Sequence, residues 1–87
     1  MIFTVLWKPL AEEELTSIWI DAQDRQTISA AANEIDRLLR VDPQSQGESR
    51  SGSQRVMIIE PLVVAFEVEE DDRRVSVLSV RFHSREQ

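Results

Sequence analysis

The run of alternating residues from Val75 to His83 (VSVLSVRFH) restricts the fold of this chain more than any other feature. Successive side chains on a β-strand point to opposite faces of the sheet, so the run predicts a strand with two different faces. The face predicted to lie in the core carries Ser76, Leu78, Val80 and Phe82. The other face changes from apolar to polar toward the C-terminus and carries Val75, Val77, Ser79, Arg81 and His83.

Arg81 and His83 end the polar side of this predicted strand. A guanidinium is permanently cationic and can hold a phosphate through two parallel hydrogen bonds. An imidazole is the side chain best suited to proton transfer near pH 7. Together they suggest a phosphodiester substrate. A strand end that emerges into solvent also commonly carries Arg and His for solubility alone, and the residues by themselves leave both interpretations open.

The first half of the chain predicts one strand and two helices. Ile2 to Trp7 is rich in β-branched and aromatic residues, which favours a strand. Helices are predicted over Pro9–Ala22 and Arg25–Val41, the second with Asp24 as its N-cap. Apolar residues at spacings of three and four give each helix one buried stripe, which predicts a helical hairpin. The glutamates at 12–14 are expected to form a solvated face.

Three strands are predicted in the second half, over Gln54–Glu60, Leu62–Val68 and Arg74–Phe82. Pro61 marks the first turn and the acidic run Glu69–Asp72 the second. The expected fold is therefore α+β in the order β-α-α-β-β-β, with the hairpin on one face of a small, mainly antiparallel four-stranded sheet. The other face would be partly open and able to hold a polymer strand or a peptide.

Residues 42–53 (DPQSQGESRSGS) join the second helix to these strands and hold both glycines of the chain. This composition predicts a flexible loop within a single domain of residues 1–87. Glu48 and Arg50 are the charged residues inside the loop. A solvated connection explains them as well as a functional role does.

Composition excludes several classes of site. The chain has no cysteine and one histidine, so neither a thiolate nor a multi-histidine metal site is available, and no cofactor is expected. The apolar opening, residues 1–7, is too short to span a membrane and lacks the flanks of a signal peptide. We therefore expect a cytoplasmic protein without membrane association.

The charge distribution bears on nucleic-acid binding. Ten basic against sixteen acidic side chains give a net charge of −6, which argues against binding through bulk charge. Residues 44–87 hold six basic and eight acidic groups, and four of those acids are the run at 69–72. If that run is a hairpin tip, the rest of this half is locally basic. The charge distribution therefore leaves open the hypothesis of a local basic patch on an acidic protein.

The element order and several local motifs resemble the RelE/ParE superfamily of toxins from bacterial type II toxin–antitoxin systems. The motifs are WKP followed by AEEEL, a helix ending in DRLL, a loop with DP and GESR, and a last strand in DDRRVSVLSVR. The resemblance covers nearly the whole chain. It implies a small α+β toxin neutralised by a cognate antitoxin, whose disordered tail wraps the helices and the sheet. An apolar patch of Val63, Ala65, Val75 and Val77 would be the natural surface for it.

The RelE and YoeB branches of this superfamily imply a metal-free endoribonuclease that cuts messenger RNA in the ribosomal A site. Its chemistry is general acid–base catalysis with electrostatic stabilisation. By likeness to the Arg-Tyr-His-Tyr motif of the YoeB-like branch, Arg81 would hold phosphate and His83 would be the general acid. Glu48 matches the loop glutamate that is the candidate base, and Arg50 and Arg55 would bind substrate.

The chain departs from that nuclease pattern. The middle-strand arginine falls on Val63, Ser84 replaces the terminal tyrosine, and Phe82 lacks a phenol. Losing one positioned charge stabiliser costs about 10² to 10³ in rate, and Arg55 would compensate only from the same sheet face as Val63. The ParE branch shares the fold, lacks the nuclease residues and poisons DNA gyrase by binding. A third alternative is an inactive toxin-like protein that only binds its antitoxin.

Overall fold

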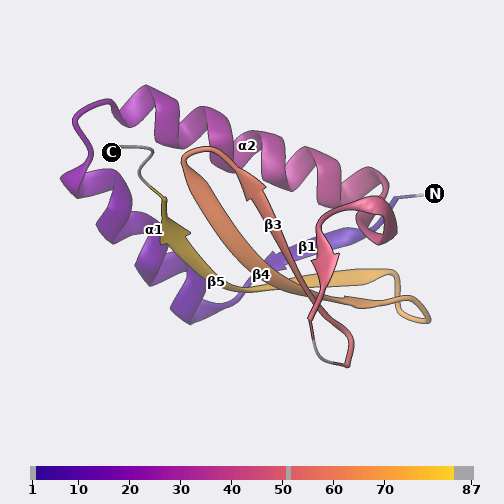
Figure 1. Ribbon diagram of the computed structural model, residues 1–87. Helices are drawn as coiled ribbons and strands as arrows, with labels where there is room; N and C mark the ends of the chain where they lie inside the picture. The colour runs from indigo at the N-terminus through magenta and orange to yellow at the C-terminus, as the bar shows by residue number, and fades with distance from the viewer. Residues whose placement is uncertain (1, 51, 84–87) are drawn as a thin grey trace.

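The computed structural model describes residues 2–50 and 52–83. Within them, two helices pack on a five-stranded sheet, which confirms the predicted α+β class (Figure 1). The elements in chain order are β1 (Thr4–Trp7), α1 (Pro9–Asp21), α2 (Arg25–Val41), a 3₁₀ helix η1 (Pro43–Ser45), β2 (Glu48–Ser49), β3 (Gln54–Ile59), β4 (Leu62–Glu69) and β5 (Arg74–Phe82).

The strands lie in the order β1-β5-β4-β3-β2, with β4 in the middle of the described sheet. β1 pairs parallel with β5, and the other neighbours pair antiparallel. The prediction of four strands is wrong by one, because two residues of the segment predicted as a loop, Glu48 and Ser49, pair with Val56 and Arg55 as β2. A two-residue strand is too short to leave a periodic signal in the sequence.

The core lies between the helices and the sheet. α2 buries the stripe of Ile28, Ala31, Ile35 and Leu39, as its spacing predicts. α1 is seated less deeply, because among its residues only Ala11 is fully buried while Leu10 and Ile20 are exposed. The sheet contributes Met57, Leu62, Val64, Phe66, Val75, Val77 and Val80 to the core.

The face of β5 that packs on the helices differs from the predicted one. Val75 and Val77 are fully buried, whereas Ser76 is only partly buried. The predicted core face is therefore wrong for the first half of the strand. The predicted apolar patch is also wrong in two of its four members, since Val75 and Val77 cannot contact a partner.

A β-bulge in β5 explains this difference. Ala65 pairs with Ser79, but the next residue of β4, Phe66, pairs with Val77. Leu78 is thus an extra residue without a partner of its own, and the side chains exchange faces at this point. Beyond the bulge the prediction is right for Val80, which is buried, but not for Phe82, which is 54% exposed and does not belong to the core.

Side chains at the turn between the helices fix the two helix ends. Asp24 caps α2, with its carboxylate accepting hydrogen bonds from the Thr27 hydroxyl at 2.7 Å and the Thr27 N–H at 3.3 Å. These bonds, the hydroxyl first, lower the pKa of the Asp24 carboxyl. Arg25 donates to the carbonyls of Trp19 and Ile20, which end α1, at 3.1 and 2.9 Å. Its guanidinium also lies 4.7 Å from the centre of the Trp19 ring.

Glu14 connects α1 to the part of β5 that β1 does not reach. The pairing of β1 with β5 ends at Val77, so the N–H of Val80 on the same edge lacks a strand partner. The Glu14 carboxylate accepts a hydrogen bond from that N–H at 2.8 Å. The expectation that the glutamates at 12–14 all lie in solvent is therefore wrong for Glu14, which is partly buried.

Replacing Glu14 should weaken this connection. In Glu14→Ala the N–H of Val80 loses its partner, and we expect a loss of about 1 to 2 kcal/mol in the free energy of unfolding, measured by urea denaturation. Glu13→Ala is the matched control, because Glu13 is exposed on the same helix turn and should change stability by less than about 0.5 kcal/mol. Equal unfolding midpoints for the two variants would show that the bond carries no stability.

Candidate functional site

The candidate site is the face of the sheet that points away from the core. On β4 the buried residues Leu62, Val64 and Phe66 alternate with Val63, Ala65 and Glu67, and paired residues share a face. The register then assigns the neighbours of Val63, Ala65 and Glu67 to the same face. We call this surface the open face. Its members on β2 to β5 are Glu48, Gln54, Val56, Ile58, Val63, Ala65, Glu67, Glu69, Arg74, Ser76, Ser79 and Arg81.

Arg81 lies at the end of β5 on the open face. It pairs with Val63, which in turn pairs with Ile58 on β3. Arg81 is exposed, and Ile58 is 55% exposed. The guanidinium therefore stands at the end of a row across three strands whose other two members are apolar. The residue beside it is a valine, where the nuclease pattern requires an arginine.

His83 follows β5 directly. Its backbone N–H donates to the carbonyl of Pro61 at 2.7 Å, which continues the ladder one step beyond the pair of Leu62 and Phe82. The residue is exposed. Arg81 and His83 therefore end the same strand two positions apart, with their backbones held by β4. Ser84 lies outside the described residues.

Glu48 is also on the open face but far from Arg81. It pairs with Val56, so β3 and β4 separate it from β5. Three strand spacings correspond to about 14 Å between the backbones. The Glu48 carboxylate is 80% exposed and lies 3.4 Å from the guanidinium of Arg50. The predicted base and the predicted acid thus lie at opposite sides of the face, and the two loop residues pair with each other.

Arg55 has a structural role in the 42–53 segment. It pairs with the buried Phe66, so it lies on the face opposite to Arg81. Its guanidinium donates to the carbonyls of Gln46 and Gly47 at 2.9 and 3.1 Å. Arg55 therefore does not substitute for the arginine that the nuclease pattern has at position 63. Its role in substrate binding stays a prediction.

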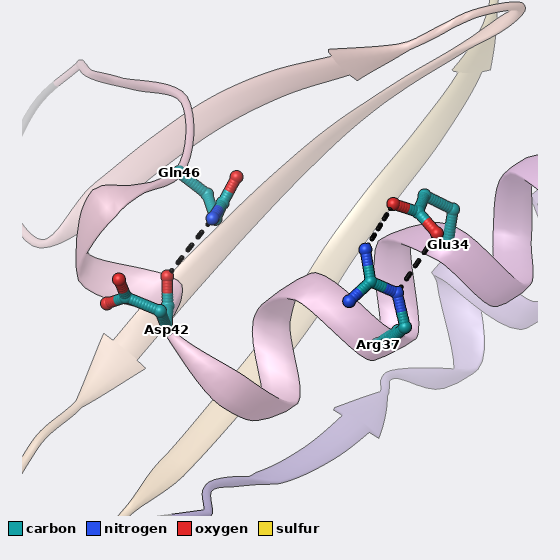
Figure 2. A network of polar contacts seen from close by, with 4 residues as sticks. All are labelled: Glu34, Arg37, Asp42 and Gln46. Carbon is teal, nitrogen blue, oxygen red and sulfur yellow. Dashed lines mark hydrogen bonds and ion pairs between the residues drawn. The ribbon is translucent and has the colours of Figure 1, made fainter.

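Further contacts hold the same segment, which includes η1 and β2 where only a loop was predicted. The Gln46 side chain donates to the carbonyl of Asp42 at 3.3 Å, at the end of α2 (Figure 2). On the same helix, Glu34 and Arg37 form the ion pair also seen in Figure 2. Gly47 has a φ of 68°, and an added Cβ would collide with the carbonyl of Val56. The segment is thus tied to α2 and β3 through its backbone.

A second apolar surface lies between the helices and was not found from the sequence. A groove of about 270 Å³ is lined by Leu15, Thr16, Trp19, Ile28, Ser29, Ala32 and Asn33. Trp19 is 40% exposed, and its indole N–H donates to the hydroxyl of Ser29 at 3.1 Å. Trp19 belongs to the stripe predicted to be buried. A helical stripe does not show which of its members the sheet actually covers.

The described residues offer neither a cluster of metal ligands nor a membrane-spanning helix. In residues 2–50 and 52–83, no three His, Asp or Glu side chains gather as metal ligands would. None of the helices in these ranges has the length and apolar character needed to cross a bilayer.

Residues 5–87 match the family model described as the ParE toxin of the type II toxin–antitoxin system parDE. The chain belongs to the ParE toxin family. The protein is therefore a toxin of a type II toxin–antitoxin system, as the resemblance to the RelE/ParE superfamily implied. No curated protein sequence matches the chain.

Solved structures of toxins from the same superfamily share this fold. The RelBE2 toxin–antitoxin complex from Mycobacterium tuberculosis is similar with a TM-score of 0.76 at 13% identity, covering 95% of this chain and 93% of that one. The chromosomal ParDE system from P. aeruginosa gives 0.70 at 17%, covering 95% and 98%. The YoeB dimer from Staphylococcus aureus gives 0.66 at 14%, covering 97% and 100%. At these identities the likeness concerns the fold of this ParE-family toxin, not its activity.

The structural role of Arg55 can be tested by proteolysis. In Arg55→Ala the carbonyls of Gln46 and Gly47 lose their donor, so we expect trypsin to cut after Arg50 at least several-fold faster than in the wild type, as followed by mass spectrometry of the 1–50 fragment. Arg55→Lys should not restore protection, because an ammonium lacks the planar fork that reaches both carbonyls. Arg81→Ala is the control, and its cleavage after Arg50 should match the wild type. Unchanged cleavage in Arg55→Ala would remove the proposed role.

Proposed function

We propose that this ParE-family toxin acts by binding a protein target, DNA gyrase, and not by cutting RNA. The observation that carries the proposal is Val63. This apolar residue lies next to Arg81 on the open face, at the position where the nuclease branches are expected to have an arginine. Binding to a protein needs no catalytic constellation, and an apolar surface suits it.

The arrangement of the other predicted catalytic residues supports the same proposal. Cleavage of a phosphodiester needs an acid and a base within hydrogen-bond reach of the reacting atoms, with cations around the phosphate. Here Glu48 is three strands away from Arg81 and already pairs with Arg50. The guanidinium of Arg55 is engaged on the other side of the sheet. The net charge of −6 also opposes approach to ribosomal RNA.

One observation favours a second candidate function. Arg81 and His83 are both exposed and end the same strand, which is the pair expected in a metal-free ribosome-dependent endoribonuclease. In that alternative Arg81 holds the scissile phosphate of messenger RNA, His83 protonates the leaving oxygen, Glu48 is the base, and Arg50 contacts the substrate. Both candidate targets, gyrase and the ribosome, are cytoplasmic, so we propose that location for the toxin.

The proposed function is tested by comparing two assays on purified toxin. We expect the wild type to inhibit DNA supercoiling by gyrase and to leave transcripts intact in ribosome-programmed translation with defined A-site codons. His83→Ala should inhibit gyrase as strongly as the wild type, because no proton transfer is involved. Cleaved transcripts that disappear in His83→Ala, together with an inert gyrase assay at saturating toxin, would establish the nuclease alternative instead.

We also propose a cognate antitoxin as a partner, because similar folds occur in the ParDE and RelBE complexes. The groove between α1 and α2 offers it an apolar surface with a half-exposed indole, and the acidic character of the toxin suits a basic antitoxin segment. Trp19 would be the main contact, because large aromatic side chains dominate binding energy at interfaces.

Antitoxin binding can be measured with the protein encoded by the reading frame next to the toxin gene. Trp19→Ala should weaken the complex at least about 10-fold in titration calorimetry, as expected for an aromatic interface anchor. Ile20→Ala is the matched control, because Ile20 is 55% exposed on the same helix but does not line the groove. Equal affinities for the two variants would place the antitoxin elsewhere.

A further inference from the structure

Arg81 differs from every other arginine in the described residues, because its guanidinium has no partner there. Arg37, Arg40, Arg50 and Arg74 form ion pairs with carboxylates. Arg25 and Arg55 donate to backbone carbonyls, and Arg73 lies over the ring of Phe3. In a chain with sixteen acidic side chains, an unpaired arginine does not reflect a shortage of carboxylates.

The surroundings of Arg81 on the open face are apolar. Two adjacent rows of the β5–β4–β3 ladder form a compact surface, which we call the Arg81 patch. Its members are Arg81, Val63 and Ile58 in one row and Ser79, Ala65 and Val56 in the other. None of the six carries a carboxylate. Ile58 is 55% exposed, so the patch presents a large apolar side chain to solvent.

The acidic groups that β2 and β4 place on the open face, Glu48, Glu67 and Glu69, lie outside the patch or are already paired. Glu67 belongs to the row of Gln54 and Ser76, beyond the bulge. Glu48 borders Val56 but pairs with Arg50 at 3.4 Å. Among residues 2–50 and 52–83 nothing pairs with the guanidinium of Arg81, so the patch presents one positive charge beside an apolar surface, on a protein whose net charge is −6.

We infer that the Arg81 patch is the surface that binds the protein target, through a target segment in which a carboxylate lies beside apolar side chains. The inference rests on the proposed function and names the surface and the chemistry that it requires. Arg81 would hold the carboxylate in a bidentate pair, and Ile58 and Val63 would bury the neighbouring apolar groups. Arginine is among the residues that most often dominate interface energy.

The same patch is poorly suited to RNA. Proteins that hold single-stranded nucleic acid stack bases on aromatic rings and contact several phosphates. The six residues of the patch include no aromatic side chain and a single cation. The charge and shape of this surface thus favour an acidic and apolar protein segment, and RNA binding becomes one of the outcomes to be tested.

The test uses four variants of the full-length toxin in the gyrase supercoiling assay. Arg81→Glu should raise the toxin concentration for half-maximal inhibition at least about 30-fold, the size of an interface hot spot. Ile58→Asp should raise it at least about 10-fold. Arg37→Glu, which reverses an exposed charge on α2, and Ile20→Asp, which places a carboxylate at an equally exposed isoleucine of α1, should both stay within about twofold of the wild type. Circular dichroism melting of each variant checks that it is folded. If Arg81→Glu is unfolded, Arg81→Lys takes its place, and a smaller loss of inhibition is then expected.

The outcomes separate this inference from the proposed function. If wild type inhibits gyrase and Arg81→Glu does so equally well, the patch is not the target surface although the function stands. If the wild type is inert on gyrase, the proposed function fails. The role of the patch is then tested by growth arrest when the wild type and each variant are expressed. Loss of arrest in Arg81→Glu and Ile58→Asp, but not in His83→Ala, would support a different protein target. The inference would be overturned if both Arg81→Glu and His83→Ala lost growth arrest and the wild type cut transcripts. It would also be overturned if the wild type caused no growth arrest.

Discussion

The alternation of β4 is the constraint on which the rest of the structure depends. Leu62, Val64 and Phe66 have no exposed surface, and the strand lies in the middle of the described sheet. Because a shift of one residue would turn all three into solvent, the register of β4 against its neighbours is strongly fixed. That register decides the face of every residue on β3 and β5. The composition of the open face is therefore a consequence of how the core is packed.

This constraint explains which sequence predictions succeeded. The two helices and the three C-terminal strands follow from periodic apolar residues, and the structure confirms them. The core face of β5 could not be obtained in the same way, because Leu78 interrupts the alternation without leaving a Gly or Pro signal. Ser76 was thus predicted to lie in the core and Val77 outside it, whereas Val77 is buried and Ser76 is only partly buried. For the same reason Val75 and Val77 were wrongly assigned to the apolar patch.

The polar contacts were harder to predict than the elements, because they depend on distances between segments far apart in the chain. Glu14 was indistinguishable from its two neighbours in sequence, yet its carboxylate reaches the N–H of Val80, 66 positions away. Nor did the sequence indicate that the guanidinium of Arg55 would donate to the carbonyls of Gln46 and Gly47 in the 42–53 segment. In both cases a charged side chain satisfies backbone groups that the ends of strands leave without partners.

The open face also suggests how one fold serves toxins of different activity. Its residues alternate with the core residues along the same strands but contribute little to the core, so an exchange such as arginine for valine at position 63 leaves Leu62 and Val64 in place. Under the proposed function, a chain with an apolar row beside an exposed guanidinium keeps the shared toxin fold while its surface selects a protein target. For this reason the residues around Arg81 say more about the target than the overall similarity to RelE, YoeB or ParE structures does.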